Sequence, residues 1–341
     1  MRNTFADTLC TLAAEDEKIY LLAGDMGFGV LDKFQAENPD RYINAGIAEQ
    51  NMTAVAAGLA LEGNIVFTYS FANFVTLRCL EQIRNCVAYH KANVKIVSIG
   101  AGMPYGAHGI THHATDDLSV MRAIPDIKIF SPSDAYEAVA VTKAAYKIDG
   151  PCYIRLGKGR EPLIHKHEIK NYTIGSAIKI FDGEDCAIFS TGAISQEALK
   201  AAKDLNSAGI STALFTFPTI KPLDVEVVEE YARKCKMLVT VEENNIIGGF
   251  GSAVAEVVAD LRGERAFVKR FGINDEFTCI VGNHDYLKGC YKLKAENIFE
   301  TVSRKMSESI NVSGGGLYRI KSLFHTRNIE VDLPIRIERF P

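Results

Sequence analysis

The chain has 341 residues, and its 38 lysines and arginines against 42 aspartates and glutamates give a net charge of −4 at pH 7. This length allows two domains that each bury a core, while the acidic balance argues against a nucleic-acid-binding surface. No apolar run reaches the ~18 residues that span a membrane, so we expect no membrane segment. The eight cysteines form no C-x-x-C pair and the N-terminus resembles a helix rather than a signal peptide, so we expect buried thiols in the cytoplasm.

Strand and helix patterns alternate through the first part of the chain. Short apolar runs predict strands at residues 19–23, 65–69, 94–99, 127–130 and 151–156. Helix patterns lie between them at residues 49–61, 74–89, 117–123 and after Asp134, which pairs with Glu137 in a capping-box-like pattern. Buried strands separated by helices are typical of a parallel sheet covered on both faces, so we expect a doubly wound α/β domain over residues 1–160.

A second α/β set follows a polar stretch that we interpret as a linker at residues 161–175. Its strands are predicted at residues 186–190, 212–216, 237–241 and 266–268, and its helices at 195–208, 224–235 and 251–261. The second domain therefore spans residues 176–305. Beyond Met306 the pattern breaks, which predicts an irregular tail over residues 306–341, with an edge strand or hairpin at 329–340.

Glu49 stands at the start of the long apolar helix predicted at residues 49–61, within the segment G-I-A-E-Q-N at 46–51. Few basic residues surround it in the sequence, so we expect no simple ion pair. A carboxylate in apolar surroundings can share a proton with a heteroaromatic nitrogen. The plainer interpretation is a first-turn glutamate that the helix dipole stabilises by about 0.3–1 kcal/mol. The motif in isolation favours that plainer interpretation.

Further motifs favour the other interpretation, in which Glu49 shares a proton with a heteroaromatic nitrogen. Four occur in order in the first domain: A-G-D at residues 23–25, G-I-A-E-Q at 46–50, Y-S-F-A-N-F at 69–74 leading into E-Q-I-R-N at 81–85, and G-I-T-H-H at 109–113 followed by M-R-A-I-P at 121–125. V-E-E-N at 241–244 with G-G-F-G-S at 248–252 follows in the second domain. With these motifs in register, residues 1 to about 300 resemble the C-terminal half of transketolase, and most closely the split enzymes in which this half is a separate subunit.

The resemblance implies two doubly wound domains, a pyrimidine-binding domain followed by the transketolase C-terminal domain. It also implies a thiamine diphosphate site. Glu49 would activate the aminopyrimidine of the cofactor, Phe71 and Phe74 would form an aromatic wall beside it, and Asp25 and Ile47 would complete the cofactor contacts. Core packing for the phenylalanines and a loop-capping role for Asp25 are the plainer interpretations of these residues taken singly.

The substrate side is implied by three further residues. His112 matches the histidine that faces the donor sugar, and it would be catalytic together with Glu49 and His108. The family's usual acidic pair is replaced here by Ala107-His108, and Lys158 stands where the family has a phosphate-binding arginine. Two further phosphate positions align with Gly29 and Gly100. We therefore expect His108, His112 and Lys158 to contact a substrate that is not a standard pentose or hexose phosphate.

A missing motif points to a partner. The family binds diphosphate and Mg²⁺ through a Gly-Asp-Gly motif and a downstream asparagine pair, and no Gly-Asp-Gly occurs in this sequence. Asn244-Asn245 lies in the wrong domain for that role. The resemblance thus implies no metal ligand in this chain, a separate N-terminal subunit that holds Mg²⁺, and an α2β2 heterotetramer.

The implied reaction is transfer of a two-carbon ketol unit from a ketose to an aldehyde. A reaction like that of 1-deoxyxylulose-phosphate synthase or of a 2-oxoacid dehydrogenase β subunit remains an alternative, as does a non-catalytic assembly subunit of the same fold. A weaker alternative is nucleotide binding at the G-F-G-S-A segment at residues 249–253, where packing of a helix N-terminus is the plainer interpretation.

Overall fold

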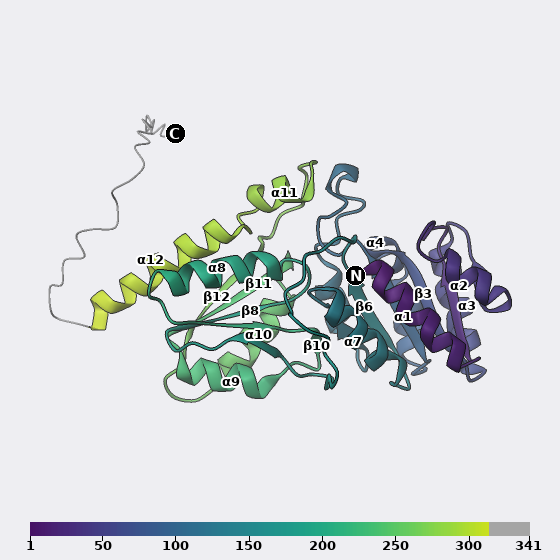
Figure 1. Ribbon diagram of the computed structural model, residues 1–341, viewed down its shortest axis with the longest axis horizontal. Coiled ribbons are helices and arrows are strands. Elements are labelled where there is room, and N and C mark those ends of the chain that lie inside the picture. The colour runs from purple at the N-terminus through teal and green to yellow at the C-terminus, as the bar shows by residue number, and fades with distance from the viewer. Residues whose placement is uncertain (314–341) are drawn as a thin grey trace, which may run out of the picture.

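The computed structural model describes residues 1–313, and the side chains of residues 1–308. Two α/β domains lie next to each other along the long axis of the molecule, with the N-terminal one at the right of Figure 1. The strand or hairpin expected at 329–340 lies outside the described residues. Within them, no helix combines the length and the apolar character needed to cross a membrane.

The first domain carries the helices and strands that its apolar periodicity predicts, with several short additions. Its helices are α1 (Arg2–Glu15), α2 (Asp32–Glu37), η1 (Pro39–Arg41), α3 (Glu49–Leu61), α4 (Ala72–Val75), α5 (Leu80–Gln82), η2 (Ile83–Ala88), η3 (Gly106–His108), α6 (Asp117–Ala123) and α7 (Ala135–Tyr146). Its strands are β1 (Ile19–Ala23), β2 (Tyr42–Asn44), β3 (Ile65–Phe71), β4 (Val94–Ile99), β5 (Lys128–Phe130) and β6 (Cys152–Leu156).

The second domain begins after an irregular segment. Its strands are β7 (Ile178–Phe181), β8 (Cys186–Ser190), β9 (Thr212–Thr216), β10 (Thr219–Lys221), β11 (Met237–Asn245) and β12 (Phe267–Ile273). Its helices are α8 (Ser195–Ser207), α9 (Val225–Lys234), α10 (Phe250–Asp260), α11 (His284–Cys290) and α12 (Ala295–Ser313).

The first sheet has the strand order β10-β5-β6-β4-β3-β1-β2 and is parallel except for β10, which runs antiparallel to β5. Apolar residues of α1 and α7 pack on one face, and those of α3, η2 and α6 pack on the other. This arrangement confirms the predicted doubly wound fold. β10 follows β9 in the chain, so the second domain supplies an edge strand of the first sheet.

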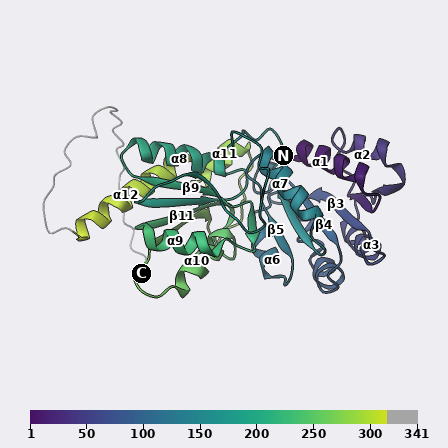
Figure 2. The same cartoon turned by 60° about the horizontal axis from the view of Figure 1, so that its bottom comes forward.

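The second sheet has the order β12-β11-β8-β9-β7, with only β7 antiparallel among these five strands. Helices α8 and α12 pack on one face, and α9 and α10 on the other, as Figure 2 shows. One apolar cluster contains residues of both domains, including Met121 beside the first sheet and Phe250 of α10. The two domains therefore share a continuous core.

The prediction of one continuous helix at residues 74–89 is wrong in one respect, because the helix is interrupted between α4 and α5. The Thr76 hydroxyl donates to the Ala72 carbonyl, and the Cys79 thiol donates to the Phe74 carbonyl at 3.2 Å. Such side-chain bonds to the backbone compete with a continuous helical ladder. The chain resumes as a helix in α5 and continues in η2 as a π-helix, and Arg78 lies in the turn at residues 76–79 that separates α4 from α5.

Two smaller expectations also differ. The irregular tail is expected to begin at residue 306, but helix α12 continues to Ser313. The cysteines are all free, but Cys279 and Cys290 are exposed rather than buried. The predicted cap is confirmed, because the Asp134 carboxylate accepts from the Glu137 backbone N–H at 3.0 Å.

Candidate active site

Glu49 lies at the first position of α3 and is 1% exposed. Its Oε2 accepts a hydrogen bond from Arg78 Nη1 at 2.8 Å, whereas its Oε1 has only a long 3.5 Å contact from the Ser70 hydroxyl. The expectation that Glu49 has no simple ion pair is therefore wrong. The broken helix after α4 brings Arg78 to it from 29 residues away, and the guanidinium also lies 4.5 Å from the centre of the Phe74 ring.

Asp25 and Ile47 flank Glu49 on the open side. A Cβ at Gly24 would lie 2.9 Å from Ser70 Oγ and 3.3 Å from Glu49 Cγ, so the absence of a side chain there lets the end of β1 approach the carboxylate. Asp25 follows at the carboxyl end of this parallel strand, where ligands of such sheets bind. It is exposed, and its carboxylate accepts from the Asn44 amide at 3.1 Å. Ile47 is 77% exposed.

Phe71 and Phe74 form an aromatic cluster with His112. Their ring centres are 5.6 Å apart at an interplanar angle of 76°, and the His112 ring lies 5.1 Å from Phe71 and 5.0 Å from Phe74. His108 lies 4.8 Å from His112, and Tyr105 lies 4.9 Å from Phe71. The fold thus brings together the two aromatic residues and the two histidines that the sequence singled out.

His112 is half-buried in this cluster. Burial lowers its pKa, and the neighbouring imidazoles of His108 and His113 lower it further. Its Nδ1 lies 3.0 Å from the Thr111 hydroxyl. A neutral ring can both accept and donate a proton near neutral pH, so this environment suits exchange of protons with a bound hydroxyl.

Lys158 joins the same cluster from the segment after β6. Its Nζ lies 4.7 Å from the centre of the Tyr105 ring, so the cation lies beside an aromatic residue that contacts both histidines. It also lines a cavity of about 330 Å³ between the two domains, with Arg160, Lys200 and Lys288 among the other lining residues.

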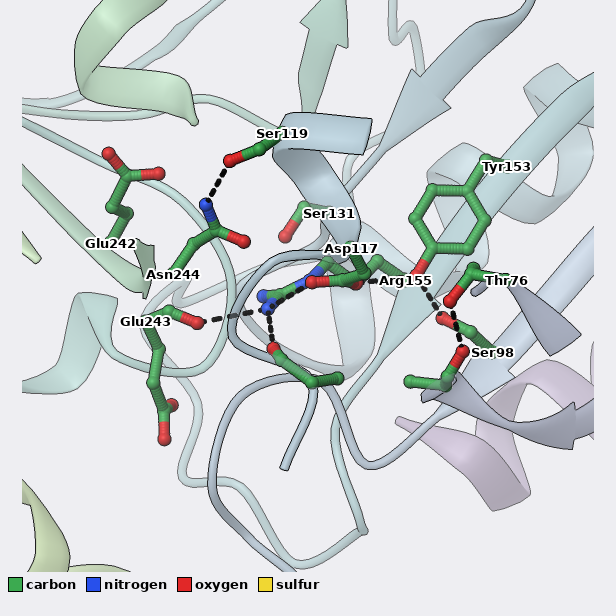
Figure 3. A network of polar contacts seen from close by, with 12 residues as sticks. Thr76, Ser98, Asp117, Ser119, Ser131, Tyr153, Arg155, Glu242, Glu243 and Asn244 are labelled. Carbon is green, nitrogen blue, oxygen red and sulfur yellow. Dashed lines mark hydrogen bonds and ion pairs between the residues drawn. The ribbon is translucent and has the colours of Figure 1, made fainter. Parts of the chain in front are cut away.

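A network of polar contacts joins residues of the two domains (Figure 3). Arg155 is 2% exposed and binds both oxygens of Asp117, at 2.7 Å and 3.1 Å. It also donates to the carbonyls of Ala114 and Glu243, at 2.9 Å and 3.0 Å. Tyr153 donates to Asp117 from the other side. Burial opposes the charge of Arg155, but Asp117 outweighs it and raises the pKa of Arg155.

Sequence reasoning missed Arg78 and Tyr105. Arg78 stands four residues after Phe74, and this spacing places two residues on the same face of a continuous helix. The sequence did not reveal that the helix is interrupted at Arg78, so it did not reveal the contact of Arg78 with Glu49. Tyr105 is an isolated aromatic residue in a glycine-rich loop. A Cβ at Gly100 would lie 2.2 Å from its ring, so glycine at that position leaves room for the tyrosine.

The weaker alternative, a nucleotide site at residues 249–253, has two of its backbone donors already occupied. The backbone N–H groups of Phe250 and Gly251 already donate to the Glu242 carboxylate, at 2.6 Å and 2.7 Å. A Cβ at Gly249 would lie 2.2 Å from the same carboxylate. These glycines allow packing at the start of α10, in agreement with the plainer interpretation.

Comparison with known proteins bears on both domains. Residues 1–162 match the family model described as the transketolase pyrimidine binding domain, and residues 175–298 match that of the transketolase C-terminal domain. The chain is 39% identical to a putative transketolase C-terminal section of Methanocaldococcus jannaschii, over 90% of this chain and 96% of that protein.

Two further relatives extend this match. The 6-deoxy-6-sulfo-D-fructose transketolase subunit SqwH of a Clostridium species is 38% identical, over 87% of this chain and 92% of that protein. The structure titled a split gene transketolase, inactive beta4 tetramer, aligns with a TM-score of 0.80 and 36% identity, covering 90% of this chain and 97% of that one. The chain therefore belongs to the transketolase family, as the C-terminal subunit of a split transketolase.

Proposed function

We propose that this chain forms one wall of a thiamine diphosphate site and, with a separate N-terminal subunit, transfers a two-carbon ketol unit from a ketose to an aldehyde. The observation that carries the proposal is the buried Glu49 carboxylate beside the cluster of Phe71, Phe74 and His112. A non-catalytic assembly subunit would have no use for a buried carboxylate that is linked through Arg78 to the Phe74 ring of this cluster.

These groups fit the aminopyrimidine of the cofactor. Glu49 Oε1 has only the long Ser70 contact, so it retains the capacity to bind a protonated ring nitrogen. Phe71 and Phe74 are half-buried and offer ring surfaces to a flat heterocycle. Asp25 and Ile47 are exposed beside them and would border the cofactor.

The chain's own residues would divide the work as follows. Thiamine diphosphate, when bound, supplies the stabilisation of the transferred carbanion. Glu49 would hold the proton at the pyrimidine nitrogen N1′. His112 and His108 would bind the donor's hydroxyl groups and exchange protons with them, because the lowered pKa of His112 keeps its ring neutral near pH 7.

A partner subunit is supported by the apolar rim of the site. Ile47 is 77% exposed, Phe28 is 79% exposed on the segment that follows Asp25, and Ile110 is 44% exposed in the loop that carries His112. Exposed apolar side chains grouped around a site favour a protein interface. We propose that the N-terminal subunit covers this rim and holds the diphosphate through Mg²⁺.

The assembly and its location are also part of the proposal. The relative solved as a β4 tetramer is described as inactive, as expected of a subunit that lacks its partner. We propose an α2β2 heterotetramer in the cytoplasm, where the free cysteines of this chain would remain reduced.

The substrate is proposed to be an anionic sugar other than a standard pentose or hexose phosphate. Lys158 beside Tyr105 supports an anionic end, because an ammonium group meets an anion as a point charge without the bidentate geometry of arginine. A relative at 38% identity is named for a sulfonated fructose. Turnover of xylulose 5-phosphate at the rates of ordinary transketolases would refute this specificity.

The decisive experiment is Glu49→Gln in the complex coproduced with its N-terminal subunit. Loss of the acid should lower kcat by about 10²- to 10⁴-fold. Glu62→Gln, an exposed glutamate at the other end of α3, should leave kcat unchanged. Near-normal activity of Glu49→Gln would support the assembly subunit instead, and release of CO₂ would support a 2-oxoacid substrate.

Calorimetric titration of thiamine diphosphate gives a second readout. Binding should require both subunits and Mg²⁺, and Glu49→Gln should weaken it. Tight metal-dependent binding to this chain alone would contradict the shared site.

A further inference from the structure

We propose that Glu243 of the second domain is a positioning residue for the histidine loop, defined as residues 100–114 between β4 and α6. The inference rests on the proposed function, because it concerns the loop that carries His108 and His112. It assigns the second domain a direct part in the active site, although both histidines belong to the first domain.

Glu243 is 2% exposed and has two bonds through one oxygen. Its Oε1 accepts from the Met103 backbone N–H at 2.8 Å and lies 2.6 Å from His284 Nε2. Burial alone would raise the pKa of Glu243, but His284 and the Met103 N–H lower it. Burial likewise opposes the charge of His284, and Glu243 raises its pKa. The pair thus holds an ionised carboxylate against the loop backbone.

The loop backbone is shaped to receive this carboxylate. Gly102 has a φ of +79°, and a Cβ there would lie 2.4 Å from the Glu243 carboxyl carbon. The following side chain, Met103, is fully buried in the apolar cluster of the second domain. The start of the loop is therefore anchored in the second domain by one side chain and one N–H group.

The second domain also packs against the middle and the end of the loop. A Cβ at Gly106 would lie 2.3 Å from Leu287 and 2.5 Å from the Gly282 carbonyl oxygen. His113 is 1% exposed, and its Nδ1 lies 2.8 Å from the Thr278 hydroxyl. His113 is thus a structural neighbour of His112, and the segment around α11 packs against the loop at Gly106 and His113.

A shift at Met103 would reach the histidines through short connections. Gly102 and Ala114 pair as an antiparallel bridge with N···O distances of 3.0 Å and 2.8 Å, which closes the loop at its base. Tyr105 follows Met103 by two residues and contacts His108 at a ring distance of 6.0 Å and His112 at 6.5 Å. On the other side, the Asn73 amide donates to the His113 carbonyl at 2.7 Å.

The chain offers a matched control in the preceding residue. Glu242 and Glu243 are consecutive on β11, so their side chains point to opposite faces of the second sheet, and Figure 3 shows them diverging. Both are buried. Glu242 binds the start of α10, whereas Glu243 binds the histidine loop. Glu242→Gln therefore replaces a buried carboxyl group on the same strand without touching the loop.

The first test is hydrogen–deuterium exchange on the full chain, which does not depend on any activity. Glu243→Gln should accelerate exchange at least tenfold in peptides covering residues 100–114, because the charged bond to Met103 is lost. Glu242→Gln should leave those peptides unchanged. Equal exchange of the loop in both variants would overturn the inference.

The second test uses the complex with the N-terminal subunit. Glu243→Gln should lower kcat/KM for the ketose donor by about 10- to 100-fold through misplacement of the histidines, with an unchanged Kd for thiamine diphosphate. Glu242→Gln should keep both values. An equal loss in both variants, or a loss of cofactor affinity in Glu243→Gln, would overturn the positioning role.

His112→Ala separates this inference from the proposed function. If His112→Ala has the same kcat/KM for the ketose donor as the wild-type complex, the proposed function of the loop is wrong. If His112→Ala impairs the reaction while Glu243→Gln does not, only the positioning role fails.

Discussion

The two sides of the candidate site differ in how the chain holds them. Asp25 and Ile47 are exposed on the first domain, whereas Glu49 close to them is buried and has Arg78 as its ion-pair partner. The histidine loop is enclosed at its base, with contacts to Asn73 of the first domain and to Glu243 and Thr278 of the second, while Ile110 at its tip is exposed. Contacts within this chain hold the enclosed side in place, whereas the exposed apolar side chains of the open side are typical of a surface that another subunit covers.

This difference predicts where mutations act. On the enclosed side they should affect folding and substrate handling, because the groups that touch the loop are buried between two domains. On the open side they should affect cofactor affinity and assembly and leave the folded chain intact.

The largest expected effect is on the enclosed side, at Arg155→Leu. This change leaves Asp117 buried without its cation, so it should lower the free energy of unfolding by about 3–5 kcal/mol. Urea denaturation would measure it. Glu256→Gln is the control, because it breaks the Arg122–Glu256 pair, in which Glu256 is 63% exposed, and it should cost less than about 1 kcal/mol. Equal losses in the two variants would contradict the comparison.

A smaller effect is expected on the open side, at Arg78→Ala. The side chain of Arg78 is 44% exposed, so loss of its contacts with Glu49 and Phe74 should weaken thiamine diphosphate binding about two- to fivefold, the equivalent of ~0.5–1 kcal/mol. Calorimetry on the complex would measure this, with the exposed Arg84→Ala as control. Tighter binding in Arg78→Ala would mean that Arg78 competes with the cofactor for Glu49 rather than holding the carboxylate in place.

The smallest effect concerns pH. His112 must be neutral to accept a proton, so kcat/KM should fall as the pH drops through its lowered pKa. His108→Asn removes a neighbouring imidazole that helps to lower this pKa, while burial continues to lower it, so the acid limb should move to higher pH. Profiles of kcat/KM against pH would detect the move. His90→Asn, whose ring contacts Tyr89 instead of the cluster, should leave the limb in place.

Much of the fold was predictable because its strands are continuous apolar runs. β3, β4 and β8 coincide closely with predicted segments, since both of their faces are covered by helices. β10 was not predicted, because three residues ending in Lys221 carry no periodicity, and their strand character comes from pairing with β5. The break after α4 was also hidden, because side-chain bonds to the backbone decide it.

In the candidate site, too, the sequence predicted the individual residues but not their tertiary partners. The sequence motifs named Glu49, Phe71, Phe74, His108 and His112, and the fold brings the last four into one aromatic cluster. Motifs do not reveal tertiary partners, so the ion pair of Glu49 with Arg78 could not be read from the sequence. The contacts of Glu243 with a loop 140 residues away were hidden for the same reason.

Because the second domain supplies β10 to the first sheet, the first domain cannot be truncated cleanly at the domain boundary. A fragment that stops at residue 160 would lose β10, and β5 would present unpaired N–H and carbonyl groups at the border of the sheet. Such a border invites pairing with other copies and aggregation. A swap of the C-terminal domain between relatives should therefore keep the recipient's own Thr219–Lys221 within the grafted domain, because this strand pairs with β5 of the recipient's first sheet.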